Sequence, residues 1–411
     1  MVSRYDMRYL VFLRGIPGSG KSTFVRENNL EPYTISSDSV RLLLKPPVLS
    51  VTGRPAISQK INRRVWGLIY SIIKCRMEDG DFTVIDATNA GNADIAKYRK
   101  LVRTYRYTAI CIDFSDIPLE IAKERNRKRP EYEIVPETVI DELYSIINRQ
   151  KVPSFVTVIK PQKFYEKLRY KPADFSHYRK IHHIGDIAGN YTALMQYFAC
   201  GLNDNDLYIF LGDYTGREVE RAENIGNPEN PEIIKFLLSI MCRENVILLE
   251  GDHERNFRRL EEGEKQTQIS EFADTRYYLP EIEQAGITRN CVLNLYKKLK
   301  PCIYYKFGNR YVLVTHGGLS SLPENLVFVG AEQMINGVGE PEDAYMVAAN
   351  FNKNTNENTY QVHGHRNPEN LPIENGRTFN LCSEKEGFLR IVTLNRYGFH
   401  SQEIKIQKLT F

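Results

Sequence analysis

Gly15-Ile-Pro-Gly-Ser-Gly-Lys-Ser-Thr23 decides the fold of the first part of the chain, because it matches the pattern G-x-x-x-x-G-K-[ST] in full. It follows Tyr9–Leu13, a short apolar run typical of a buried parallel strand, and precedes a helix that we expect from about Ser22. Glycines let backbone N–H groups close around phosphates, and a helix N-terminus adds a favourable dipole. The motif therefore predicts a nucleoside triphosphate site, with Gly15, Gly18, Ser19, Gly20, Lys21, Ser22 and Thr23 as its nucleotide-binding residues.

Two side chains of this loop carry specific chemistry. Lys21 can reach the β- and γ-phosphates, which makes it a catalytic as well as a binding residue, and the Ser22 hydroxyl can ligate Mg²⁺. The motif alone does not separate a kinase from an ATPase or a GTPase.

A second segment, Ile35-Ser-Ser-Asp38-Ser-Val-Arg41, comes where a second strand of this sheet would end. Asp38 could take the proton from an attacking hydroxyl, and Arg41 could hold a substrate phosphate. The plain alternative is that Asp38 caps the following helix.

Two further segments fit a phosphotransferase. Asp86 ends a predicted strand in Val84-Ile-Asp-Ala-Thr-Asn89, as a ligand of a Mg²⁺-bound water would. Arg125 and Arg129 share one helix face and could clamp nucleotide phosphates from a lid. Taken alone, such an Arg-rich helix is usually only a solvated face.

Strands and helices alternate through this part of the chain. Apolar residues at 3- and 4-residue spacings predict a helix over 61–77, and the segments 120–129 and 136–149 are also helix-like. Phe82–Ile85 and Thr108–Ile112 are predicted strands. The pattern indicates a parallel sheet flanked by helices.

Composition divides the 411 residues into two chemically different parts. Residues 1–180 hold 32 Lys+Arg and 20 Asp+Glu, whereas the rest hold 23 and 31, and none of the eight histidines precedes His177. The seven cysteines form no C-x-x-C pair, which argues for a reducing, cytoplasmic setting. With no apolar run near the ~18 residues of a membrane span, no membrane partner is expected.

The length and these shifts predict two domains. We place the first at 1–152, a basic linker at 153–178, and the second at 179–411. The alternative for 153–178 is an extra strand and a loop belonging to either domain. The basic and aromatic residues of 160–171 could bind strand phosphates and stack bases, or could form an ordinary solvated linker.

The second part carries carboxylates and imidazoles in loops after successive predicted strands. Side chains at such positions can converge on a two-metal site that activates water. Each element alone could be a common turn or a buried histidine, but five in this order together indicate a metal site. They are Gly185-Asp186-Ile-Ala188, Gly212-Asp213-Tyr-Thr-Gly216-Arg217, Gly251-Asp252-His253-Glu254, His316-Gly-Gly318 and His363-Gly-His365.

The motifs GxxGSGKST, ISSD-x-x-R, DATN and ERN-x-x-R, in this order, resemble the kinase domain of bacterial and phage polynucleotide kinase-phosphatases over about residues 7–150. The resemblance implies a P-loop phosphotransferase using ATP and Mg²⁺. In it Asp38 is the general base for a 5′-hydroxyl, Arg41 contacts the acceptor nucleotide's phosphate, and Arg125 and Arg129 contact the ATP phosphates.

The second set resembles the calcineurin-like binuclear metallophosphoesterases over about 180–394, which implies an α/β sandwich binding Mn²⁺ or a similar divalent metal. Its implied metal ligands are Asp186, Asp213, Asp252, His316 and His365. His253 takes the place of the catalytic histidine and Arg217 that of the phosphate-binding arginine. His363 has no firm place in the pattern.

Three positions depart from that family's pattern. Ala188 replaces a metal-ligating histidine, Gly216 replaces the aspartate that orients the catalytic histidine, and Asp252 replaces asparagine. An engineered substitution at position 188, a diverged enzyme and a degenerate domain all remain open. We expect metal binding to persist, at least at the second metal position, with impaired or narrowed phosphoesterase activity.

The two resemblances together imply a bifunctional enzyme that heals RNA ends. It would phosphorylate 5′-hydroxyl ends with ATP and remove 2′,3′-cyclic or 3′-phosphate, acting on nucleic acid such as tRNA ends. A separate RNA ligase would seal them, and the resemblance suggests a phage-encoded protein in the host cytoplasm; self-association stays open. The alternatives are a small-metabolite kinase fused to a nucleotide phosphoesterase, and an active kinase with a non-catalytic RNA-binding platform.

Overall fold

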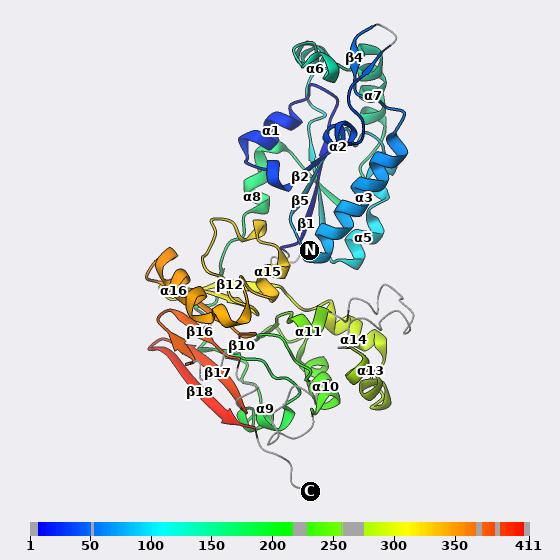
Figure 1. Ribbon diagram of the computed structural model, residues 1–411. Coiled ribbons are helices and arrows are strands. Elements are labelled where there is room, and N and C mark those ends of the chain that lie inside the picture. The colour runs from blue at the N-terminus through cyan, green and yellow to red at the C-terminus, as the bar shows by residue number, and fades with distance from the viewer. Residues whose placement is uncertain are drawn as a thin grey trace. The chain divides into compact units, whose positions relative to one another are not determined.

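The computed structural model describes residues 7–50, 53–216, 228–255, 257, 275–366, 372–382 and 387–406 (Figure 1). It divides into two compact units, Met1–Arg169 and Tyr170–Phe411. The predicted α/β class is confirmed for both. Among the described residues, no helix is long and apolar enough to cross a membrane. All seven cysteines are free thiols.

The first unit is a five-stranded parallel sheet in the order β2-β5-β1-β6-β7. Figure 1 shows α3 and α5 along one side of this sheet and α1 and α8 along the other. Its elements are β1 (Tyr9–Arg14), α1 (Lys21–Glu27), β2 (Thr34–Ser36), α2 (Ser37–Leu44), β3 (Val48–Leu49), β4 (Pro55–Ala56), α3 (Asn62–Asp79), β5 (Thr83–Asp86), α4 (Asn92–Ala96), α5 (Arg99–Thr104), β6 (Thr108–Asp113), α6 (Leu119–Arg127), α7 (Glu137–Arg149), β7 (Val156–Ile159) and α8 (Phe164–Leu168).

Burial explains why these elements form. Every residue of β1 is buried, because the strand lies in the middle of the sheet. The predicted helix over 61–77 corresponds to α3, which buries Val65, Ile69, Ile73 and Met77 at the four-residue spacing of one helix face. The sheet thus holds the loop after β1 at its carboxyl edge, where ligands bind in open α/β sheets.

The segment expected to be a linker, 153–178, is divided between the units. β7 is the edge strand beside β6, and Phe164 of α8 is buried with its ring 5.2 Å from that of Phe24. β8 (Ala173–Asp174) instead pairs with a strand of the second unit. The extra-strand alternative therefore describes this segment.

The second unit contains two sheets, in the orders β11-β10-β9-β17-β18 and β15-β16-β14-β13-β12-β8. The buried His183 ring of the first sheet lies 2.8 Å from the Tyr305 hydroxyl of the second, so these faces pack together. Its elements after β8 are β9 (Lys180–Ile184), α9 (Tyr191–Tyr197), β10 (Asp206–Phe210), α10 (Asn230–Ile240), β11 (Val246–Leu248), α11 (Asp252–Arg255), α13 (Thr275–Gln284), α14 (Arg289–Tyr296), β12 (Cys302–Phe307), β13 (Arg310–Thr315), α15 (Ala331–Ile335), α16 (Ala344–Asn354), β14 (Thr359–His363), β15 (Glu374–Asn375), β16 (Thr378–Asn380), β17 (Phe388–Asn395) and β18 (Gly398–Lys405).

Candidate active sites

The phosphate loop connects β1 to α1 and is shaped by its glycines. Gly18 and Gly20 have φ angles of +81° and +101°, which non-glycine residues rarely adopt. A Cβ on Gly18 would lie only 2.1 Å from the carbonyl oxygen of Ala122 in α6, so a side chain there would displace backbone. The Ser19 hydroxyl is buried and has no hydrogen-bond partner in the described part of the chain, which fits a donor awaiting a phosphate oxygen.

Lys21 and Ser22 begin α1, with the exposed Thr23 beside them. Lys21 Nζ donates to the carbonyl oxygens of Gly15, at 2.7 Å, and Ile16, at 3.1 Å. The ammonium therefore lies over the loop. Burial lowers the pKa of Lys21, whereas the charge of Asp86 opposes that shift.

The Ser22 hydroxyl donates to Asp86 Oδ2 across 3.3 Å, which brings together the two side chains expected to serve Mg²⁺. Burial raises the pKa of Asp86, and Lys21 opposes this. A hydroxyl and a carboxylate are hard oxygen donors, so this pair fits Mg²⁺.

Asp38 lies in the first turn of α2, but it is not the cap of this helix. The cap is Ser36, whose hydroxyl accepts a hydrogen bond from the Ser39 N–H. Asp38 instead pairs with Arg41, whose Nη1 lies 2.9 Å from Asp38 Oδ1. Asn62, which sequence reasoning missed, accepts from the same guanidinium.

Both lid arginines come near the phosphate loop. Arg125 Nη1 lies 3.9 Å from the position that a Cβ on Gly20 would take. The charge of Arg129 acts on Lys21 and Asp86, and its Nη1 donates to the Glu133 carbonyl at 3.1 Å. These positions suit contacts with nucleotide phosphates.

In the second unit, four of the expected metal ligands converge. Asp213, Asp252, His316 and His365 each offer a donor atom within 4.8 Å of the others. They follow β10, β11, β13 and β14, so both sheets contribute. Two carboxylates and two imidazoles suit a divalent transition metal, and this donor set fits one such ion.

The field at this cluster is strongly negative. Burial disfavours the charged form of His316, but the carboxylates of Asp213 and Asp186 outweigh it and hold the pKa well above its ordinary value. Asp186 lies beside the group: its Oδ2 accepts from the His365 N–H at 2.8 Å, whereas its Oδ1 is buried without a hydrogen-bond partner. The surroundings therefore favour a cation.

The place of the first metal does not fit a second ion equally well. Ala188 is buried with φ +46° and brings no donor atom. A Cβ on Gly216 would lie 2.1 Å from the Ala188 carbonyl oxygen, and Asn230 Oδ1 accepts from the Gly216 N–H at 2.9 Å. The Ala188 backbone therefore occupies the space that a side chain at position 216, an aspartate in the family pattern, would need.

His253 has an orienting partner that the sequence did not indicate. Its Nδ1 lies 2.9 Å from the Thr215 carbonyl oxygen, which replaces the carboxylate absent at Gly216. The carboxylate is absent, as the sequence indicated, and a backbone carbonyl orients the ring instead. Despite burial, Asp213 and Asp252 raise the pKa of His253 to about 10.

The Glu254 carboxylate connects the loops after β10 and β11. It accepts hydrogen bonds from the backbone N–H groups of Asp213, Tyr214 and Gly251, at 2.9, 3.0 and 3.0 Å. This fixes the loop after β10 against the loop after β11.

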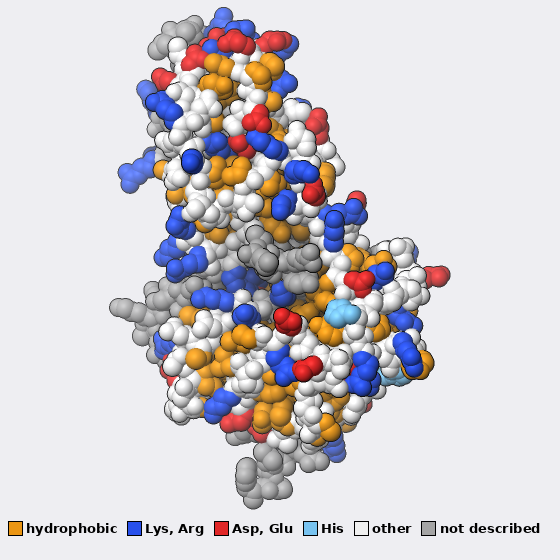
Figure 2. Space-filling model, turned by 180° about the vertical axis from the view of Figure 1, so that it is seen from behind, with side chains coloured by type: hydrophobic (Ala, Val, Ile, Leu, Met, Phe, Trp, Pro, Cys, Tyr) orange, Lys and Arg blue, Asp and Glu red, His pale blue; other side chains and the backbone are white. Residues whose placement is uncertain are grey.

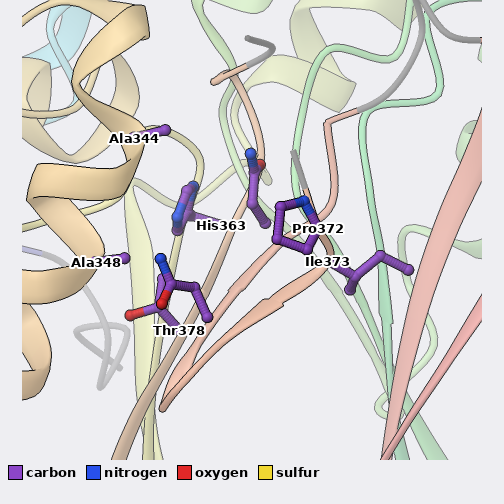
Figure 3. Close-up of a pocket in the computed structure, with 8 residues that line it drawn as sticks. Ala344, Ala348, His363, Pro372, Ile373 and Thr378 are labelled. Carbon is purple, nitrogen blue, oxygen red and sulfur yellow. The ribbon is translucent and has the colours of Figure 1, made fainter. Parts of the chain in front are cut away.

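His363, which had no firm place in the motif, is buried at the end of β14. Its Nδ1 bonds the Gly364 carbonyl at 2.9 Å, and burial lowers its pKa to about 3. Its ring lines a small pocket with Ala344, Pro372 and Thr378 (Figure 3). Arg217, expected to bind phosphate, lies outside the described residues.

Two protein families match this chain, one over each of its two parts. The first half matches the AAA domain family over residues 10–147, and the second matches the calcineurin-like phosphoesterase family over residues 179–396. Together with the phosphate loop and its companions, the first match indicates a kinase-like P-loop domain.

Solved structures resemble the chain only distantly. A protein serine/threonine phosphatase from Saccharomyces cerevisiae is 14% identical, with 57% of this chain and 82% of that chain covered and a TM-score of 0.36. A metallophosphoesterase from Sphaerobacter thermophilus is 13% identical, with 56% of this chain and 89% of that chain covered and a TM-score of 0.34. A gluconokinase from Sinorhizobium meliloti is 14% identical, covering 38% and 83%, with a TM-score of 0.24.

The phosphoesterase match spans more than half of the chain and coincides with the unit that gathers Asp213, Asp252, His316 and His365. Through this unit, and with a kinase-like P-loop domain ahead of it, the chain belongs to the calcineurin-like phosphoesterase family.

Proposed function

We propose that the chain heals broken RNA ends. Its first unit phosphorylates 5′-hydroxyl ends with ATP, and its second unit removes 2′,3′-cyclic or 3′-phosphates. The observation that carries the proposal is the coexistence in one chain of a phosphate loop beside a carboxylate–guanidinium pair, Asp38–Arg41, and a phosphoesterase donor cluster.

In the kinase unit, the loop from Gly15 to Lys21 binds ATP, and Ser22 and Asp86 would hold Mg²⁺. Bound Mg²⁺ would neutralise charge on the transferred phosphoryl group. Asp38 accepts the proton of the attacking hydroxyl, because its carboxylate is partly exposed and oriented by Arg41. Arg125 and Arg129 offset the charge that develops on the phosphoryl oxygens.

In the phosphoesterase unit, the four-donor cluster would hold a divalent cation such as Mn²⁺. Such an ion supplies Lewis-acid chemistry to a phosphoryl oxygen or a water. His253 then holds or delivers a proton at Nε2, since its Nδ1 is tied to the Thr215 carbonyl. The loss of donors at positions 188 and 216 supports a narrowed rather than a general phosphatase.

The basic balance of residues 1–180, with 32 Lys+Arg against 20 Asp+Glu, supports a polyanionic acceptor. On the face seen in Figure 2, Lys and Arg side chains are spread over this unit among Asp and Glu. Segment 160–171 contributes less than its sequence indicates, because Phe164 is buried and Lys160 pairs with Asp116 at 2.7 Å. Stacking of bases on Phe164 is thereby excluded.

One experiment tests both activities together. An RNA with a 5′-hydroxyl and a 2′,3′-cyclic phosphate is incubated with ATP and Mg²⁺ or Mn²⁺, and both ends are read. The expected products are a 5′-phosphate and a 3′-hydroxyl. Lys21→Ala should lose only the first and His253→Ala only the second. Phosphorylation of nucleosides or sugars, with RNA untouched, would contradict the proposal and support a small-metabolite kinase.

A further inference from the structure

Asn62, the first residue of α3, is bonded to the guanidinium next to the expected general base. Its Oδ1 accepts from Arg41 Nε at 3.1 Å and from Arg41 Nη2 at 2.9 Å, while Arg41 Nη1 donates to Asp38 Oδ1 at 2.9 Å. The three side chains form one continuous chain of hydrogen bonds from α3 to α2. Arg41 is buried, so this arrangement fixes its guanidinium.

The bonding also fixes the direction of the Asn62 amide. A guanidinium only donates, so the atom facing it must be the amide oxygen. The Nδ2 group, with two N–H donors, then points away from Arg41. Asn62 is exposed, and no described residue accepts a hydrogen bond from Nδ2.

Arg41 has donors to spare as well. A guanidinium carries five N–H groups, and three of those on Arg41 are used by Asp38 and Asn62. One N–H remains on each of its Nη1 and Nη2 atoms. Unused donors of Asn62 and Arg41 therefore lie next to each other.

The surroundings favour an anion at this place. The first turn of α3 contains no acidic residue, and Arg63 and Arg64 in it are exposed. Peptide dipoles at a helix N-terminus add to this positive potential.

We propose that Asn62 binds, together with Arg41, the phosphate that follows the 5′-terminal nucleoside of the acceptor strand. The inference rests on the proposed function of the first unit. Because the same guanidinium is bonded to Asp38, a phosphate held here brings the 5′-hydroxyl of its nucleoside to the general base. Asn62 thus selects a polynucleotide, or a nucleoside 3′-phosphate, over a nucleoside that lacks the phosphate.

The test is steady-state phosphorylation of three acceptors: a 5′-hydroxyl oligonucleotide, a nucleoside 3′-monophosphate and the matching nucleoside. Asn62→Asp keeps an oxygen facing Arg41 but replaces the free amide donors with a negative charge. We expect it to raise KM for both phosphate-bearing acceptors about 10- to 100-fold, as for a lost hydrogen bond to a charged group. KM for ATP and for the nucleoside should stay unchanged.

Gln59→Glu is the matched control, because it adds the same charge three residues away on an exposed side chain that does not contact Arg41. It should change the acceptor KM much less. An equal effect of both variants, or an Asn62→Asp variant with an unchanged acceptor KM, would overturn the subsite. If the unmodified protein phosphorylates no 5′-hydroxyl oligonucleotide, the proposed function itself fails, and this subsite with it.

Discussion

The Nδ1 atom of His253 lies 2.9 Å from the carbonyl oxygen of Thr215, so a backbone group orients this imidazole. A carbonyl can only accept, and it therefore keeps a proton on Nδ1, which makes Nε2 the ring nitrogen that can exchange a proton. The Thr215 carbonyl thus provides a hydrogen-bond acceptor for this ring, where Gly216 offers no carboxylate.

Replacement of His253 tests this role. His253→Ala should lower the rate of 2′,3′-cyclic phosphate hydrolysis about 10²- to 10⁴-fold, because it removes a positioned proton donor. The metal content should stay the same, since His253 is not among the four clustered donors. Elemental analysis beside the rate measurement separates the two effects, and a parallel loss of metal would assign His253 a ligand role.

Asp38→Ala should abolish phosphate transfer to 5′-hydroxyl ends while ATP binding persists. The structure supplies a control for the capping interpretation: Ser36→Ala removes the true cap of α2, at a cost of about 1 kcal/mol in the free energy of unfolding. That variant should retain transfer. Labelling of 5′-hydroxyl RNA and titration with ATP measure both, and normal labelling by Asp38→Ala would reduce Asp38 to a structural residue.

Metal stoichiometry should be one tightly bound Mn²⁺ per chain. The cluster offers four donors for one ion, whereas Ala188 offers none at the other position. His316→Ala should lower the affinity sharply. Asp186→Asn should leave one ion bound, because its amide oxygen can still accept from the His365 N–H. Electron paramagnetic resonance of Mn²⁺-loaded protein distinguishes isolated from coupled ions, and a coupled pair in the unmodified protein would contradict this prediction.

Acid should destabilise the second unit through His183. Burial lowers the pKa of this imidazole to about 4, although its bond to the Val392 carbonyl opposes the shift. In the unfolded chain the His183 imidazole has a pKa near 6.5, so between about pH 6.5 and 4 it binds a proton that it does not bind in the folded chain. Stability should therefore be level above about pH 6.5 and fall as the pH drops toward 4, by at most about 3 kcal/mol. Thermal melts of the native protein and His183→Gln across this range measure the contribution, which the variant should lack.

Gly18→Ala should abolish ATP binding. Its Cβ would lie 2.1 Å from the Ala122 carbonyl, and φ is +81°, so the loop must shift. Gly67→Ala in α3 is the control, since a Cβ there meets nothing within 4 Å. Fluorescent nucleotide titration reads both, and unchanged affinity in Gly18→Ala would show that the loop tolerates the shift.

The sequence predicted the parts whose chemistry depends on residue type at fixed spacing. Lys21, Ser22 and the four clustered donors are of this kind, because each motif follows a strand whose apolar run is easy to recognise. Partners supplied by the backbone leave no such signal, and only the folded structure shows that the Thr215 carbonyl contacts His253.

Two other features were beyond the sequence for different reasons. Asn62 belongs to no motif, and only the packing of α2 against α3 brings it to Arg41. β7 is four residues long and lies within a basic stretch, so its place at the edge of the first sheet was only one of two alternatives.

The donors of the metal cluster are divided between two sheets, with Asp213 and Asp252 on loops of one and His316 and His365 on loops of the other. An ion bound by all four donors would link the two sheets at the edge where these loops lie. Its binding free energy would then add to the folding free energy of the second unit. Removal of the metal by a chelator should consequently lower the melting temperature of the second unit and leave that of the kinase unit unchanged.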